Sequence, residues 1–280
     1  MRPKSTCFLS LLLLSASLLT LSCSTDKNGD MVLFGIENDV KLGAQVSREV
    51  DSTYKAKGQL LARNSSDPGV RRGYAYLDQM VDRLMASGEV SYKDEFAWDV
   101  KIIDDPENLN AFATPGGHIY VFTGLIKYLD NEDQLAGVLG HEIAHADQRH
   151  TVKQLQKQYG INFLLSLVLG ENSGEVQQIA GQLAGQLAGL KFSRDYERES
   201  DAYSVTYLAA TNYYACDGAA GFFQKMQSLA QSGNPPEFIS THPNPDNRIT
   251  QIESRAKELG CNTTPKGANG YNRFKQDLGL

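Results

Sequence analysis

The sequence predicts an α+β fold that is mostly α-helical, with a small β-sheet or hairpin beside one central helix. Apolar residues recur at helical spacing along several long segments, whereas the alternation typical of strands is confined to residues 96–124. A chain of 280 residues, 41% of them hydrophobic, can bury a sizeable core. We therefore expect one α-rich domain and exclude a disordered chain.

The composition excludes two further classes of protein. The formal net charge of -6 and the sequence pI of about 5.4 argue against a nucleic-acid partner, which would require a basic surface. The mean hydropathy of -0.36 excludes a protein with several membrane spans.

The first 22 residues have the pattern of a bacterial signal peptide. Arg2 and Lys4 precede an apolar run from Phe8 to Leu21, which is too short for a transmembrane helix. Cys23 stands where a lipoprotein signal places its acylated cysteine. We expect an exported, periplasmic lipoprotein attached to the membrane by its lipid anchor only. An ordinary signal cleavage nearby, which would leave Cys23 unmodified, is the alternative.

The mature chain divides into three predicted parts. Residues 23–33 form a polar tether, residues 34–262 the folded domain, and residues 263–280 a C-terminal tail. Within the domain only Cys216 and Cys261 remain, and two cysteines in an oxidising compartment are expected to pair as a disulfide.

The first half of the domain combines helices with the sheet. Amphipathic spacing predicts helices at 36–57 and 70–86. Alternating apolar residues predict a strand at 96–103, and two more strands, at 110–114 and 118–124, flank a tight Pro-Gly-Gly turn.

The second half is helical. Asp130 or Asn131 can cap a helix that runs to His150, and 151–190 is helical in outline but interrupted by glycines. The apolar patch 161–169 is a buried or lid helix, because nine residues cannot span a membrane. A further helix starts near Ser193, and 247–259 is expected to be the last.

His141, Glu142 and His145 form the pattern H-E-x-x-H on the central predicted helix. Residues four apart differ by about 40° around a helix, so both imidazoles face the same way and can share one metal ion. Glu142 can reach a water on that metal. The pattern favours one zinc ion per chain, and incidental charges on a surface helix are the alternative.

A catalytic zinc site needs a third protein ligand and an open position. His150 is nine residues from His141, about 180° around an ideal helix, so we expect it to face away. Glu197 and Asp201 are four residues apart on a later helix, so Glu197 can bind the metal while Asp201 hydrogen-bonds a ligand histidine. Glu199 should point elsewhere. A solvated run of charges is the alternative.

Four motifs occur in the order seen in one metallopeptidase family: NAFATPGGHIYVFTGL, NEDQLAGVLGHEIAHADQRH, FSRDYERESDA and STHPNPDNRI. With them the chain resembles the HtpX-like and CAAX-prenyl-protease-like zinc metallopeptidases, above all their soluble, periplasmic, BepA-like members. The resemblance implies a zincin-like (gluzincin) fold, endopeptidase activity and Glu197 as the third zinc ligand. It departs at Ser200, where Ala is usual, and at Gln134, where Glu is usual. We also expect neither the membrane spans of the first two branches nor the tetratricopeptide domain of the BepA-like proteins.

Zinc chemistry predicts the roles of the remaining site residues. Zinc lowers the pKa of a bound water and polarises the scissile carbonyl, and Glu142 acts as the general base. Tyr196, His242 or Arg248 can stabilise the oxyanion, and the sequence does not choose among them. His242 precedes Pro243 in a Pro-rich loop. The resemblance implies that it occupies the open zinc position at rest; an oxyanion donor or a surface residue are the alternatives.

Residues Asn110, Ala111, Phe112 and Ala113 form a predicted edge strand beside the zinc helix. Such a strand can pair with an extended peptide through main-chain hydrogen bonds, although a plain core hairpin needs the same residues. His118 is expected on the strand surface and not among the ligands.

These observations together predict a zinc metalloendopeptidase of the bacterial envelope that acts in protein quality control. Its substrates would be unfolded or misassembled envelope proteins and peptides. The alternative is an envelope chaperone or assembly factor with a structural or residual zinc site.

Overall fold

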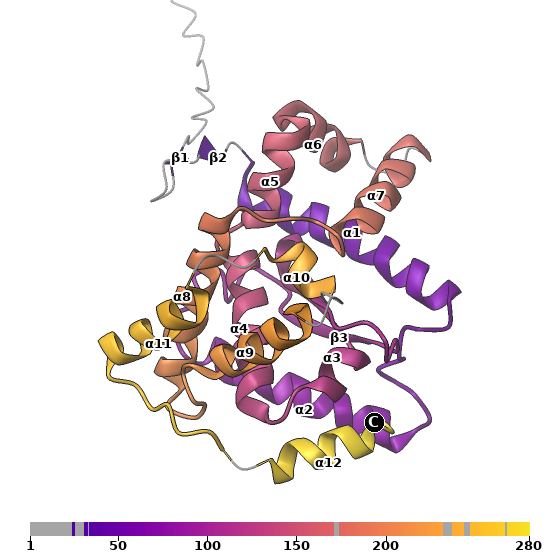
Figure 1. Cartoon of the computed structure of the whole chain (residues 1–280). Coiled ribbons are helices and arrows are strands. Elements are labelled where there is room, and N and C mark those ends of the chain that lie inside the picture. The colour runs from indigo at the N-terminus through magenta and orange to yellow at the C-terminus, as the bar shows by residue number, and fades with distance from the viewer. Residues whose placement is uncertain are drawn as a thin grey trace, which may run out of the picture. The chain divides into compact units, whose positions relative to one another are not determined.

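The computed structural model describes residues 24–25, 31–32, 34–170, 174–231, 237–243, 247–266 and 268–280 (Figure 1). The chain divides into two units, Met1–Leu33 and Phe34–Leu280. In the first unit β1 (Ser24–Thr25) pairs antiparallel with β2 (Met31–Val32). The predicted signal peptide and Cys23 lie outside the described residues. No helix in the described part of the chain has the length and apolar content needed to cross a membrane.

The second unit contains the small sheet, with strand order β3-β5-β4. β3 (Asp99–Ile103) runs parallel to β5 (His118–Phe122), and β4 (Ala111–Ala113) runs antiparallel to it. β3 starts later than the alternation predicts, because Trp98 has a φ of 44°. This backbone conformation is not extended, so the strand can begin only at the next residue. The Pro-Gly-Gly turn η1 (Pro115–Gly117) joins β4 to β5, with φ of 72° at Gly116 and 82° at Gly117. The predicted small sheet is confirmed.

Two amphipathic helices come first in the second unit, as predicted. α1 (Ile36–Ala56) buries Leu42, Val46 and Val50. α2 (Pro68–Met85) starts behind Asp67, whose side chain accepts a hydrogen bond from the Gly69 amide at 2.7 Å. The short α3 (Thr123–Tyr128) follows β5 directly.

α4 (Glu132–Asp147), the helix with the H-E-x-x-H pattern, is buried along its whole length. Its Asn131 cap accepts a hydrogen bond from the Gln134 amide at 3.0 Å. α4 packs against α8 (Arg194–Thr211) and α9 (Gly218–Gln231), which lie beside it in Figure 1. A Cβ on Gly137 would lie 2.3 Å from the Ala219 amide nitrogen, so this glycine permits the close approach of α9.

The central helix ends earlier than predicted. Arg149 adopts a left-handed conformation with a φ of 59°, and a new helix, α5 (His150–Tyr159), begins after it. Gly160 separates α5 from α6 (Ile161–Leu169). The next helix, α7 (Gly174–Leu187), packs along α1. The predicted interruption of the segment 151–190 is therefore observed.

Of the helices that follow α8, the sequence analysis anticipated only the one at 248–259; α9 and the two others given below were not expected. α10 (Glu237–Thr241) and α11 (Arg248–Leu259) are followed by α12 (Asn269–Asp277), in the segment expected to be a tail. α12 packs against α2, and the Phe274 ring stacks on Tyr76 with a centroid distance of 4.4 Å. The Tyr271 hydroxyl, which is buried, donates to the Ile126 carbonyl at 2.6 Å.

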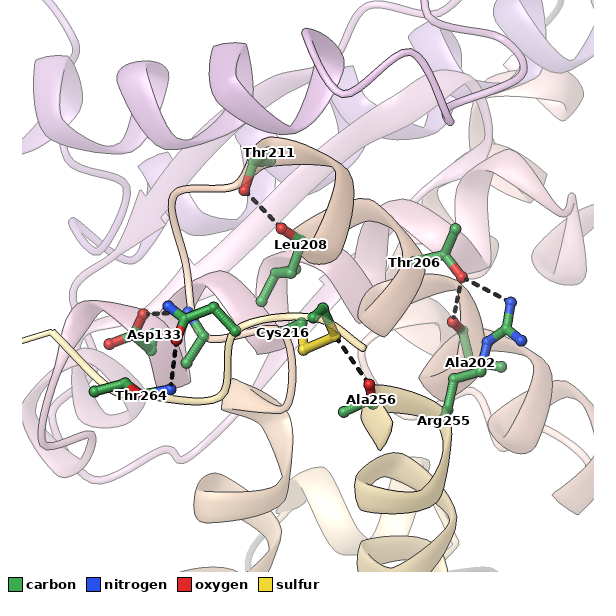
Figure 2. Close-up of a disulfide and its surroundings, with 12 residues drawn as sticks. Asp133, Ala202, Thr206, Leu208, Thr211, Cys216, Arg255, Ala256 and Thr264 are labelled. Atoms are coloured by element: carbon green, nitrogen blue, oxygen red, sulfur yellow. Dashed lines mark hydrogen bonds between the residues drawn. A yellow bond between two sulfur atoms is a disulfide. The ribbon is translucent and has the colours of Figure 1, made fainter. Parts of the chain in front are cut away.

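Cys216 and Cys261, the pair that the sequence analysis expected, form a disulfide (Figure 2). It joins the loop after α8 to the residues after α11, and the Cys216 amide also donates to the Asn262 carbonyl at 2.9 Å. Asp133, at the start of α4, accepts hydrogen bonds from the Ala215 and Lys266 amides. The disulfide thus lies in a set of contacts that connects α8, α11 and the first turn of the central helix.

Candidate metal centre

Four buried side chains bring possible metal-binding atoms together: His141, His145, Glu197 and His242. His141 and His145 lie one turn apart on α4, and their Nε2 atoms are 3.0 Å apart. Glu197 in the first turn of α8 has Oε2 3.4 Å from His141 Nε2 and Oε1 3.4 Å from His145 Nε2. The helical spacing of both motifs thus brings the three predicted ligands to one point.

The geometry and chemistry of these atoms fit zinc. Zinc bonds to nitrogen and oxygen of about 2.0–2.1 Å imply tetrahedral donors about 3.3 Å apart, close to the separations observed. His141 Nδ1 is 2.9 Å from Asp201 Oδ1, so this nitrogen carries the proton and Nε2 presents a lone pair. Lone pairs facing a carboxylate in a buried site repel one another unless a cation lies between them.

His242 supplies a fourth donor to the cluster. Its Nδ1 is 3.3 Å from His141 Nε2 and 3.0 Å from Glu197 Oε1. The residue follows α10 directly, and its ring stacks on Phe238 with a centroid distance of 4.2 Å. The loop-borne histidine is therefore held against the three ligands and not exposed on the surface.

Glu142 lies beside the donor cluster but is not one of its members. Its Oε1 is 3.5 Å from His242 Nε2, whereas His242 Nδ1 faces the donor cluster. Burial raises the pKa of the Glu142 carboxyl to about 7, and the neighbouring His242 opposes this shift. The Glu142 carboxyl is thus next to the donor cluster.

Asp201 and Arg248 surround the ligands. The Arg248 guanidinium is fully buried, and its Nη2 lies 2.7 Å from Asp201 Oδ1 and 3.0 Å from Glu197 Oε2. Its other face covers the Phe223 ring at 3.5 Å. The imidazoles of His242, His141 and His145 hold the pKa of Glu197 well below its usual range, although burial alone would raise it.

His150 was placed wrongly by extrapolating an ideal helix, whereas Glu199 points away from the donor cluster as expected. Because α4 breaks at Arg149, His150 turns back towards the site, and its Nδ1 lies 3.1 Å from His145 Nδ1. Glu199 Oε2 lies 3.3 Å from His150 Nε2. Neither residue belongs to the donor cluster, but His150 contacts its member His145 directly, and Glu199 is connected to it through His150. The sequence shows no glycine or proline at the break that could have revealed it.

The remaining candidate residues lie outside the donor cluster. β4, with Ala111, Phe112 and Ala113, is an edge strand of the sheet and packs beside α4. Asn110 uses its side chain locally: Oδ1 accepts from the Ala111 amide and Nδ2 donates to the Ala188 carbonyl. His118 pairs with Asp99, away from the donor cluster.

Two aromatic residues, Tyr196 and Phe192, lie near the donor cluster. The Tyr196 hydroxyl accepts a hydrogen bond from Lys157 Nζ at 2.7 Å, so it is engaged away from the donor atoms. Phe192, which the sequence analysis did not single out, stacks on the His145 ring with a centroid distance of 4.0 Å. Its amide also donates to the Thr241 carbonyl, next to His242. Phe192 therefore covers one ligand and contacts the segment that carries the fourth donor.

Comparison with protein families gives one match over this region. Residues 72–256 match the model of peptidase family M48. The matched segment includes all four residues of the donor cluster, together with Glu142 and Asp201.

Individual relatives match over similar lengths. The chain is 32% identical over 184 residues to the beta-barrel assembly-enhancing protease of Escherichia coli K12, covering 62% of this chain and 38% of that protein. It is 31% identical over 181 residues to the mitochondrial metalloendopeptidase OMA1 of Schizosaccharomyces pombe, covering 64% of this chain and 51% of the relative. It is 34% identical over 213 residues to the mitochondrial OMA1 metalloendopeptidase of Danio rerio, covering 70% of this chain and 42% of that protein. The matches thus span about half or less of each relative's length.

Proposed function

Because the chain belongs to peptidase family M48, we propose that it is a zinc-dependent metalloendopeptidase, a hydrolase of peptide bonds. The observation that carries the proposal is the convergence of His141, His145 and Glu197 with the carboxyl of Glu142 beside them. A purely structural zinc site would need the ligands but no carboxyl at this position.

The protein residues have distinct roles in this reaction. Zinc, when bound by His141, His145 and Glu197, polarises the scissile carbonyl and lowers the pKa of water. Glu142 takes the proton of the attacking water on its carboxylate and passes it to the leaving amine. Asp201 accepts a hydrogen bond from the Nδ1–H group of His141, which leaves Nε2 of this ligand unprotonated and free to bind the metal.

We propose that Arg248 acts close to the reacting atoms. Its Nη2 contacts both Glu197 and Asp201, whereas Nε and Nη1 are buried without a hydrogen-bond partner among the described residues. A free guanidinium donor in a buried site is suited to stabilise the oxyanion of the tetrahedral intermediate.

The substrate would bind as an extended peptide along β4. Residues Asn110, Ala111, Phe112 and Ala113 supply main-chain groups at the edge of the sheet, beside the helix that carries Glu142. Main-chain pairing recognises extended backbone with little regard to side chains. It therefore suits unfolded or misassembled proteins as substrates.

His242 would close this site at rest. Catalytic zinc sites keep one position open for water, and a fourth protein donor fills it. Support for this role comes from the two contacts of the imidazole, one with the donor cluster and one with Glu142 Oε1. Movement of the segment after α10 would release both groups together.

The proposed place of action is the bacterial envelope. The basic residues, apolar run and Cys23 at the start of the sequence support export and acylation. There the enzyme would act in protein quality control, attached to the membrane by its lipid anchor.

Cleavage of casein by the purified, zinc-loaded protein tests the proposed activity. Glu142→Gln should abolish cleavage while its zinc content equals that of the wild type, because the ligands are intact. His118→Ala, a change outside the donor cluster, serves as the control and should cleave normally. The wild type and both variants should each be assayed with and without the additional substitution His242→Ala, because His242 would close the resting site. Undiminished cleavage by Glu142→Gln would refute the proposed mechanism, and a zinc-loaded wild-type protein that cleaves no casein in either background would favour a chaperone or assembly factor with a structural zinc.

A further inference from the structure

The two histidine ligands on α4 reach a carboxylate by different routes. His141 Nδ1 contacts Asp201 Oδ1 directly at 2.9 Å. His145 Nδ1 instead contacts a second imidazole, His150 Nδ1, at 3.1 Å, and His150 Nε2 lies 3.3 Å from Glu199 Oε2. We propose that His150 and Glu199 form a hydrogen-bond relay that positions the zinc ligand His145 and fixes its tautomer. The inference rests on the proposed zinc site but not on peptide hydrolysis.

Only one arrangement of protons satisfies this relay with metal bound. His145 must present an unprotonated Nε2 to the metal, so its proton is on Nδ1, which donates. His150 Nδ1 must then accept, which leaves the proton of His150 on Nε2. This proton is donated to Glu199, an acceptor whenever it is ionised. Each bond thus determines the next, from the carboxylate to the ligand nitrogen.

The surroundings of His150 hold its ring in the required orientation. The side chain is fully buried, and the ring stacks on Tyr196 with a centroid distance of 4.3 Å and an angle of 15°. The Ser200 hydroxyl lies 3.2 Å from His150 Nδ1 and can donate to the same lone pair. With one face of the imidazole stacked and both ring nitrogens engaged, His150 presents its Nδ1 to His145 without reorganisation.

The break after α4 makes the relay possible. On a continuous helix His150 would lie on the face opposite His141. The left-handed Arg149 redirects the chain, and its guanidinium binds the buried Asp39 carboxylate of α1, with Nε 2.7 Å from Oδ2. Arg149 also donates to the Phe34 carbonyl. Contacts from the start of the domain thus stabilise the conformation that brings His150 to the ligand.

Two substitutions separate a positioning role from simple packing. His150→Phe keeps an aromatic ring to stack on Tyr196 but removes the acceptor for His145 Nδ1. His150→Asn is smaller, yet it places an amide oxygen near the former Nδ1. If His150 only filled space, Phe would be the milder change. If it accepts the proton of His145, Asn is the milder change.

Zinc affinity, measured on the purified protein by competition with a chelator, gives the first readout. His150→Phe should bind zinc about 10–100-fold more weakly than the wild type, the usual effect of removing a group that orients a metal-binding histidine. His150→Asn should bind zinc close to the wild-type value. Wild-type affinity in a folded Phe variant, or an Asn variant weaker than the Phe variant, would overturn the relay.

Imidazole ¹⁵N NMR of the zinc-loaded wild-type protein gives a second readout that needs no variant. His145 should carry its proton on Nδ1 and His150 on Nε2, with the His145 proton protected from exchange. A proton on His150 Nδ1 would overturn the proposal. A protein that binds zinc with this tautomer pattern but cleaves no peptide would refute the proposed function and leave the relay intact.

Discussion

The imidazole of His242 contacts two different groups at once. Its Nδ1 faces the donor cluster, and its Nε2 lies near Glu142 Oε1. If this side chain closes the resting site, His242→Ala should raise kcat/KM for casein, because a coordination position and the general base become accessible together. The zinc content should remain one per chain, since the proposed ligands His141, His145 and Glu197 are all retained.

The competing role predicts a change of the opposite sign. An oxyanion donor at this position would make His242→Ala lose about 10²–10³ in kcat. Such a loss would contradict the closing role, and casein kinetics beside His118→Ala distinguish the two cases.

Individual site residues could be predicted wherever the local helix is regular. The four-residue spacing on α4 placed His141 and His145 together, and the two-residue spacing on α8 separated Glu199 from Glu197. The position of His150 could not be predicted, because it depends on the contact between Arg149 and Asp39. These two residues are 110 positions apart in the sequence, so no local pattern reports the contact.

At the level of elements, the disulfide connects the loop after α8 to the segment after α11. It closes a loop of 45 residues, which corresponds to about 4 kcal/mol of lost unfolded-state entropy. We expect replacement of Cys216 and Cys261 by serine to lower the free energy of unfolding by about 3–4 kcal/mol. Denaturant unfolding measures this difference.

The wild-type protein under a reducing agent is the matched control for this variant. It should unfold at the same lower denaturant concentration as the doubly substituted protein. An unchanged midpoint in both samples would show that the cross-link contributes nothing to stability.

The elements themselves were predictable to different degrees. Amphipathic spacing located α1 and α2 to within a few residues, because both helices bury an apolar face at helical spacing. α12 was missed because its buried face consists of little more than Tyr271 and Phe274. The stacking of Phe274 on Tyr76 of α2 is a long-range contact, which the sequence of the segment alone does not reveal.

On the scale of the whole molecule, the fold assembles the metal centre from distant parts of the chain. α4 supplies two donors, α8 the third and the segment after α10 the fourth, so that His141 and His242 are 101 positions apart. α4 is buried against α8 and α9, which places all these groups away from solvent. The same packing that forms the core therefore determines the geometry of the site.

The central claim is that this buried centre binds one zinc ion through His141, His145 and Glu197, and native mass spectrometry of the zinc-loaded protein tests it most directly. The wild type should carry one zinc per chain, and Glu197→Gln should lose it. Asp195→Asn, an acidic residue on the same helix whose side chain is 83% exposed, is the control and should retain one zinc. Equal zinc content in Glu197→Gln and Asp195→Asn, or a wild type that binds no zinc, would contradict the account.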